Sequence, residues 1–506
     1  MPSDRGYGDS SDWGSLVADL APSAHAPVWR IHDRTHLEFA VDYELDAASK
    51  ESRWEWEAYF FVPASLRIDD SSYGKADIYT DLRSYIRYTV PDLPFGELTN
   101  APLDTLSRAV ALHDDERVIR ELRLFACQVR ASGLAALRSV EHLLDAGESD
   151  QRSRGLAAAA RITADAKHVA TAFREVLSSI DGATSNLETA REWSDEDVSR
   201  VIEMLLGSLV VRLRKANAPK KLVQNVTTGA VAEARYRRDE GLDGVGKARS
   251  SKREVEHLEY RRHLLKRFTS SVLWLKPQIR EGAKWALQAF YAIAAGVAMA
   301  FAVAAALLNG PNFDQDNAWM WITIAIVAYM GKDRIKAVLQ SVFSGYVRRR
   351  FPDRRWRIGD RDKQIGVVDE QSSFVKFADV PERALEERLS TRGHPLEGSA
   401  RPERVLWHKK TVALRADRVD DDRFGAVTEI FCLDLRRWLA HTDDPKRRIV
   451  FADPDEARIC SSMAPRVYNI GVVYRLRRAG DQASPWRRVR VVVTRKGIRR
   501  IDCVTT

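Results

Sequence analysis

The chain has 506 residues, with 80 Lys and Arg against 71 Asp and Glu and a formal net charge of +9. This length excludes a single compact domain, because hydrophobic cores stop growing near about 250–300 residues. The four cysteines are too few and too scattered for a disulfide framework and show no CxxC spacing, which fits reduced thiols in the cytosol. The positive charge favours an acidic partner, either anionic lipid or nucleic acid.

We expect residues 1–26 to form a polar, disordered tail. Ala24-His25-Ala26 looks like a signal cleavage site, but no basic segment precedes it and Asp19 interrupts the only apolar stretch. We therefore expect no signal peptide, and membrane insertion would rest on an internal segment.

Residues 27–100 predict a small α+β domain. Residues 37–45 and 54–62 alternate apolar and polar side chains, which predicts an antiparallel hairpin with one buried face. Ile78, Leu82 and Ile86 have helical spacing until Pro91 ends the pattern.

Residues 101–282 predict helices throughout. Apolar residues recur at steps of three and four, which fits either an intramolecular bundle or an intermolecular coiled-coil stalk. The segments 194–197 and 251–254 match the capping-box pattern and predict helix starts just before Val198 and Val255.

The longest apolar segments lie in residues 283–331 and predict a transmembrane helical hairpin. A helix over 285–308 would be roughly 36 Å long, enough to cross a hydrocarbon core of about 30 Å. The second arm, 318–330, is short and needs Lys332 and Arg334 to reach the headgroups if it is to span. Four aromatic residues are placed like the interface belts of spanning helices: Trp285, Trp319, Trp321 and Tyr329.

Small residues recur every four positions on two faces of the first arm. One face carries Ala292, Gly296, Ala300 and Ala304, and the other carries Ala294, Ala298, Ala302 and Ala306. Small residues let helices approach closely in a membrane. One face can take the second arm and leave the other for a neighbouring subunit, so we expect a homo-oligomer.

Basic residues flank the hairpin on both sides, whereas the connecting loop carries Asp314 and Asp316 and no Lys or Arg. Basic flanks mark the cytoplasmic side of a span. We therefore expect two spans in a bacterial-type inner (plasma) membrane, with both termini cytoplasmic.

Residues 332–352 predict an amphipathic juxtamembrane helix that runs into a basic cluster. We expect this cluster to contact anionic headgroups, although it can also serve only to fix topology. Phe351 and Trp356 are interleaved with it, a pattern also found in nucleic-acid binding, which we do not favour. The expected lipid-binding residues are Arg348, Arg349, Arg350, Arg354, Arg355 and Arg357.

Residues 353–506 predict a β-rich cytosolic domain, so the fold class is an α+β membrane protein. A short helix near 381–389 interrupts the strands, and an antiparallel meander or partly open barrel is expected. The predicted strands are 365–380, 405–414, 427–433, 449–451, 466–476 and 489–493.

No segment carries a specific catalytic signature, and we expect no cofactor and no metal. The glycine-rich segment 241–246 lies between helices, which indicates a connector rather than a phosphate-binding loop. His32 and His36 lie in an extended pattern, and the acidic segments 417–422 and 443–455 fit solvated turns. The apolar arms lack charged residues, which argues against an ion-coupled transporter.

The segment Gly310-Pro311-Asn312-Phe313, at the outer end of the first arm, resembles the Gly-Met-Asn loop of the magnesium-channel family. Members of that family also have a cytosolic α/β domain, long stalk helices and a two-helix membrane hairpin. The resemblance implies that Asn312 faces a hydrated ion at a pore mouth. The chain departs from the family in having Pro311 in place of Met and a large further domain after the second helix.

These patterns predict an oligomeric membrane anchor or scaffold that displays cytosolic domains for sensing or for recruiting a cytosolic protein partner. The alternative is a homo-oligomeric ion channel or pore-forming effector. A membrane-tethered enzyme would require the acidic turns of the C-terminal domain to converge.

Overall fold

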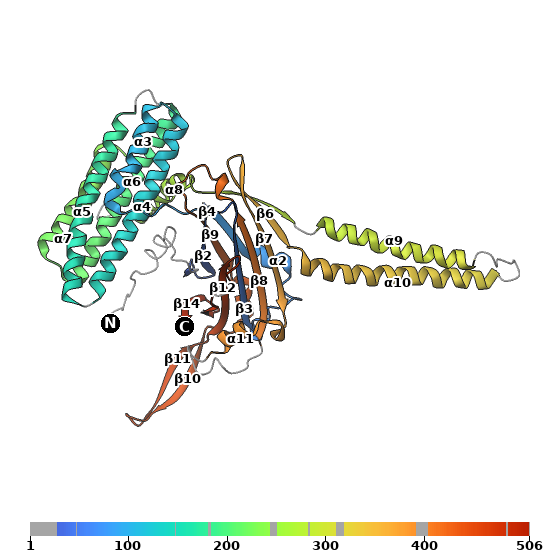
Figure 1. The fold of residues 1–506 in the computed structure, drawn as a ribbon. Helices are drawn as coiled ribbons and strands as arrows, with labels where there is room; N and C mark the ends of the chain where they lie inside the picture. Colours follow the sequence, from blue (N-terminus) through green and yellow to red (C-terminus); the bar gives the residue numbers. More distant parts are fainter. Residues whose placement is uncertain are drawn as a thin grey trace.

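The computed structural model describes residues 28–46, 48–146, 148–180, 184–242, 250–281, 284–309, 318–390, 403–481 and 484–504. The expected α+β class is confirmed, with a helical middle region and β-rich sheets built from the N- and C-terminal parts (Figure 1).

Two antiparallel sheets form the body of the protein. The smaller sheet has the order β1 (Val28–Ile31), β2 (His36–Glu44), β9 (Ala426–Asp434), β4 (Leu82–Tyr88). The larger sheet has the order β14 (Gly497–Val504), β13 (Arg487–Thr494), β12 (Tyr468–Arg478), β3 (Ser52–Pro63), β8 (Glu403–Leu414), β7 (Lys363–Val375), β6 (Arg354–Asp360), β5 (Lys276–Glu281). A separate pair, β10 (Lys446–Asp453) and β11 (Arg458–Pro465), projects from this body (Figure 1).

The two sheets enclose one shared core. The ring of Phe39 on β2 stacks on Phe431 of β9 at 4.5 Å, and Trp56 of β3 lies 5.0 Å from the same phenylalanine. Because these aromatic side chains come from both sheets, the sheets form a sandwich.

Each of the two large sheets combines strands from the N-terminal and the C-terminal parts of the chain. β3 lies between β8 and β12, and β9 lies between β2 and β4. The division into separate domains at 27–100 and 353–506 is therefore not seen. The helical region and the segment between β5 and β6 are two insertions into one sandwich, and the expected meander is wrong because β3 completes the middle of the larger sheet.

Two local predictions in the N-terminal part are also wrong. Strands β2 and β3 do not pair, because the polar turn between them carries the chain from one sheet to the other. The helix α2 (Lys75–Asp81) ends before Leu82, where the run LRSYIRY forms β4, because its aromatic residues fit a pleated surface.

The middle region is a bundle in which α6 (Ser185–Lys215) is the central helix. Its neighbours are α4 (Asp115–Asp145), α5 (Ser149–Ser178), α7 (Lys220–Asp239) and α8 (Lys252–Ser270), and α3 (Ala101–Ala111) packs on α4. The apolar stripes of these helices pack inside the bundle.

The two predicted capping boxes have different outcomes. Ser251 accepts a hydrogen bond from the Glu254 amide at 3.3 Å, and Glu254 accepts one from the Ser251 amide at 2.6 Å, so this cap is confirmed. Ser194 instead lies buried within α6. The adjacent carboxylates face other helices: Glu196 bonds Arg261, and Asp197 bonds Arg130 at 2.5 Å.

The C-terminal part contains β7, β8, β9, β10, β12 and β13 where strands were predicted, and α11 (Glu382–Leu389) where a helix was predicted. Strands β5, β6, β11 and β14 were not predicted. The remaining short elements are α12 (Arg436–Leu439), η1 (Ala64–Leu66), η2 (Phe95–Thr99), η5 (Phe377–Asp379) and η7 (Ala416–Arg418).

Helices α9 (Lys284–Asn309) and α10 (Ala318–Arg350) lie side by side and project from the body as an arm (Figure 1). Helix α10 continues through the predicted boundary at 331–332. Within the described ranges, one helical segment, Trp285–Leu307, is long and apolar enough to cross a membrane. The structure thus supports one candidate span and not two, because the charge-free part of α10 ends before Lys332.

Candidate membrane arm and its basic root

The edge of the larger sheet holds both ends of the α9–α10 arm. Strand β5 leads into α9 and α10 leads into β6, and the two strands pair antiparallel with Arg280 opposite Arg355. The two helices stay side by side beyond the paired strands. The Trp285 ring on α9 lies 6.2 Å from the Phe351 ring at the end of α10, and the Phe290 ring lies 5.1 Å from that of Phe343. The arm is therefore a direct extension of a paired ribbon.

The two small-residue faces of α9 have different surroundings. Ala294 and Ala298 are buried, 0% and 1% exposed, and lie on the side that packs against α10. The other face is exposed at all four of its members, Ala292, Gly296, Ala300 and Ala304. A Cβ added at Gly296 would meet no atom within 4 Å. This face is open to a further helix.

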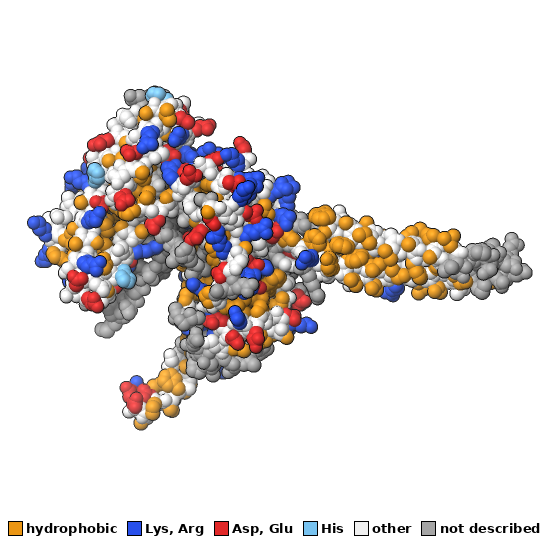
Figure 2. Space-filling view, in the orientation of Figure 1, with side chains coloured by type: hydrophobic (Ala, Val, Ile, Leu, Met, Phe, Trp, Pro, Cys, Tyr) orange, Lys and Arg blue, Asp and Glu red, His pale blue; other side chains and the backbone are white. Residues whose placement is uncertain are grey.

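Most of the large apolar side chains of the arm point outward, and Figure 2 shows them covering its visible side. An apolar surface of this extent on a soluble protein marks a site that contacts a membrane or another protein. On α9 these residues include Ile293, Val297, Met299, Phe301, Val303 and Leu307, and on α10 they include Ile322, Ile326, Val327 and Met330.

Charged residues of α10 lie beside the middle of α9 rather than beside its end. Phe301 contacts Gly331, where an added Cβ would lie 3.1 Å from the ring. Lys332 follows directly, and its ammonium lies 4.2 Å from the centre of the Tyr329 ring. The charge-free part of α10, 318–331, is only about 20 Å long at about 1.5 Å per residue.

The predicted interface aromatic residues are largely exposed. Trp285 at the root of the arm is 69% exposed, Trp319 near its tip 83%, and Tyr329 60%. The side chain of Trp321 and the predicted pore-mouth residue Asn312 lie outside the described parts of the structure. Contact of these residues with a membrane interface stays a prediction.

The predicted lipid-binding arginines have different environments. Arg355 pairs with Asp369 at 2.6 Å, and the guanidinium of Arg354 lies 4.3 Å from the centre of the Tyr79 ring. Arg350 and Arg357 are exposed, whereas the side chains of Arg348 and Arg349 lie outside the described parts of the structure.

Two exposed basic residues of β5, Lys276 and Arg280, lie on the strand that pairs with β6. We define the basic root of the arm as Lys276, Arg280, Arg350 and Arg357.

A charged cluster lies inside the sandwich, where the sequence analysis did not place one. The Lys410 ammonium is fully buried and bonds the carboxylates of Glu370, at 2.7 Å, and Glu429. The Tyr43 hydroxyl donates to Glu429 at 2.9 Å. Burial alone would lower the pKa of Lys410, but the two carboxylates raise it above its usual value. The cluster joins the two sheets, and its Lys410 ammonium is enclosed.

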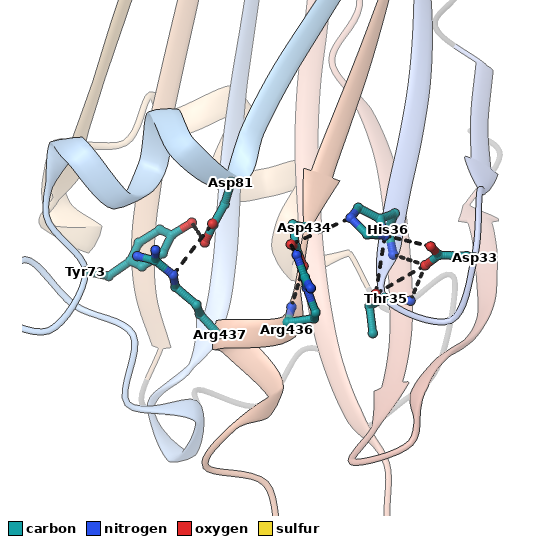
Figure 3. Close-up of polar contacts among 8 residues, drawn as sticks. All are labelled: Asp33, Thr35, His36, Tyr73, Asp81, Asp434, Arg436 and Arg437. Atoms are coloured by element: carbon teal, nitrogen blue, oxygen red, sulfur yellow. Dashed lines mark hydrogen bonds and ion pairs between the residues drawn. The ribbon is translucent and has the colours of Figure 1, made fainter.

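A second polar cluster lies at the strand ends (Figure 3). The Asp33 carboxylate lies 2.7 Å from His36 Nδ1 and accepts backbone N–H bonds from Thr35 and His36. Burial opposes the shift, but these bonds lower the pKa of Asp33 to about 2. On the other side, His36 Nε2 lies 3.6 Å from Asp434, which also pairs with Arg436. The histidine is thus held between two carboxylates and orders the turn before β2.

The other charged side chains drawn in Figure 3 also pair with oppositely charged neighbours. Arg437 lies 3.7 Å from Asp81, and the Tyr73 hydroxyl donates to the same carboxylate at 2.9 Å (Figure 3). Arg437 also pairs with Asp77. The acidic turns also pair with basic residues, as Asp421 does with Arg423 at 2.6 Å. In the described part of the chain, no three His, Cys, Asp or Glu side chains are placed to hold a metal.

Only part of the buried charge was visible in the pattern of the sequence. On β8 the inward positions alternate, so a lysine between His408 and Val412 in that alternation signals a charge facing the core. Its partners lie on other strands, Glu370 on β7 and Glu429 on β9, 40 and 19 residues away, and no periodic pattern within one strand connects them.

Comparison of the chain with protein-family models, with curated proteins and with solved structures found no match.

Proposed function

We propose that this protein is an oligomeric membrane anchor whose α9–α10 arm inserts into a bilayer. The sandwich and the bundle are then displayed on the cytoplasmic side, where they sense a signal or recruit a protein partner. The observation that carries the proposal is the exposed small-residue face on Trp285–Leu307, a helix that is itself long and apolar enough to span. In a membrane, such a face is suited to close contact between helices of neighbouring copies.

The structure gives one candidate span, Trp285–Leu307. We propose that α10, although it is not long enough by itself, crosses beside this span, with the acidic connecting loop on the far side of the membrane. The charge-free part of α10 is shorter than the hydrocarbon core of about 30 Å, so this topology needs Lys332 and Arg334 to extend toward the headgroups and the bilayer to thin locally. The polar loop that contains Asp314 and Asp316 supports full crossing, because a re-entrant arm would bury its charges.

The basic root supports the placement of the sandwich on an anionic surface. Lys276, Arg280, Arg350 and Arg357 lie where both ends of the arm enter the body. Each such charge contributes about 1 kcal/mol of attraction to an anionic leaflet. Together they would hold the larger sheet edge-on to the headgroups.

The test is the oligomeric state of the purified full chain in a mild detergent, measured by light scattering. We expect wild-type protein to be oligomeric and Gly296→Leu to shift toward monomer, because the added side chain occupies the open face. Val327→Leu, at an exposed position on α10, is the matched control and should keep the wild-type state. A monomeric wild type, or a Gly296→Leu variant with the wild-type state, would refute the proposal.

A pore is the second candidate, and one observation favours it. Lys332 and its charged neighbours Asp333 and Arg334 lie beside the middle of α9, where a ring of copies would place them around a polar interior. Ion flux across proteoliposomes tests this function, and the absence of conductance at any voltage would exclude it.

A further inference from the structure

The β10–β11 ribbon extends away from the sandwich, and no other described strand pairs with it (Figures 1 and 2). Nearly every residue of the ribbon is exposed. Large apolar side chains of the ribbon are also exposed to solvent: Val450 is 66% exposed, Phe451 47% and Ile459 74%. A two-stranded ribbon with unpaired edges is marginally stable by itself and offers an edge for pairing with another chain.

We propose that the outer edge of β10 pairs with β10 of a second copy of this chain, antiparallel about a two-fold axis at Val450. The two ribbons then form a four-stranded sheet in the order β11, β10, β10, β11. The inference deepens the proposed scaffold function by naming a second copy as partner, and it rests on that function.

The distribution of charge along β10 specifies both the partner and the register. The strand reads KRRIVFAD, with its basic residues at the root and Asp453 at the tip. A two-fold axis perpendicular to the sheet places residues of the same face opposite each other. With Val450 opposite the partner's Val450, Arg447 lies opposite the partner's Asp453 and Ile449 lies opposite the partner's Phe451, and each pair occurs twice.

Shifted registers are less complementary. Centring the axis on Ile449 places Arg447 opposite the partner's Phe451, and centring it on Phe451 places Ile449 opposite the partner's Asp453. Arg447 forms no ion pair with any described residue of its own chain, so it remains available for the partner's carboxylate.

The other edge of the ribbon is less suited to self-pairing. Strand β11 reads RICSSMAP and contains no acidic residue to match Arg458 of a second copy. Its last residue, Pro465, lacks the N–H that a ladder requires. Strand β10 has no proline between Lys446 and Asp453.

The first test is cross-linking of Val450→Cys in the full chain, reconstituted in liposomes, with Cys460→Ser and Cys503→Ser as background. Directly opposite side chains lie about 5 Å apart at Cβ, within reach of a short reagent that carries two thiol-reactive maleimide groups. We expect a covalent dimer. Ser461→Cys is the matched control: Ser461 faces Val450 across the ribbon but would lie about 14 Å from its own copy, so it should not cross-link.

The second test reverses one charge. Arg447→Glu puts two carboxylates together on each side of the axis and should weaken dimerisation about tenfold. Arg466→Glu makes the same change just after β11, at the root of the ribbon, where Arg466 pairs with Asp443 at 3.2 Å, and should leave dimerisation unchanged. Equal cross-linking of Val450→Cys and Ser461→Cys, or equal effects of the two reversals, would overturn the register.

Flotation of the same liposome samples separates this inference from the anchor. Protein that floats with the liposomes without cross-linking at Val450 would refute the ribbon contact alone. Protein that cross-links but does not float would refute the anchor. Cross-linking of Val450→Cys to a cysteine of an added protein in place of the second copy would also overturn the inference.

Discussion

Acidification is expected to destabilise the sandwich through His408. This side chain is 1% exposed, its Nδ1 lies 2.7 Å from the Ser372 hydroxyl, and its Nε2 has no hydrogen-bond partner among the described atoms. Burial lowers the pKa of His408 from 6.5 to about 4. Between these values the unfolded chain binds a proton that the folded chain does not, so stability falls as pH falls. At about 1.4 kcal/mol per pKa unit, the loss by pH 4 is about 3 kcal/mol.

Urea unfolding at pH 7 and pH 4, followed by tryptophan fluorescence, measures this effect. Carboxylates change the stability of every variant over the same range, so the informative quantity is the difference between wild type and His408→Gln. Between pH 7 and pH 4 the free energy of unfolding of the wild type should fall by about 3 kcal/mol more than that of His408→Gln, because the variant has no imidazole to protonate. His142→Gln, at an exposed histidine on α4, should follow the wild type. A wild type and His408→Gln that lose the same stability would refute the reasoning.

Two further predictions concern the buried cluster and the basic root. Lys410→Met should lower the free energy of unfolding by about 3–5 kcal/mol, because it leaves a buried carboxylate unpaired; adding Glu429→Gln should restore part of the loss in the same urea assay. Arg350→Gln combined with Arg357→Gln should weaken binding to anionic vesicles by about 2 kcal/mol at low salt, measured by co-sedimentation. Arg161→Gln, at a residue whose side chain is 82% exposed on the bundle, is the control, and an equal loss there would contradict a specific role for the root.

A short sequence pattern identified the structure correctly where the residues of the pattern bond to one another. Ser251 and Glu254 cap a helix through bonds to each other's amides, so the pattern alone identifies the helix start. The same pattern at 194–197 is wrong because its carboxylates bond residues on other helices, such as Arg130 and Arg261. Sequence spacing does not distinguish a cap from a buried ion pair between helices.

Long-range pairing was the main feature that the sequence did not predict. The alternation in β2 and β3 identifies both strands, but their partners β9, β8 and β12 lie more than 300 residues away. The small-residue faces of α9 were visible from their spacing, because a helix places every fourth residue on one side. Which of the two faces takes α10 depended on the packing of Ala294 and Ala298.

Insertion of the arm into a bilayer is tested most directly by the depth of a spin label at Val297, an exposed position near the middle of α9. The label would be read in liposomes from its collisions with oxygen, which concentrates in hydrocarbon, and with a water-soluble nickel chelate. We expect high accessibility to oxygen and almost none to the chelate, with the opposite result for a label at Gln278 on β5. A label at Val297 that the nickel chelate reaches freely would contradict the membrane anchor.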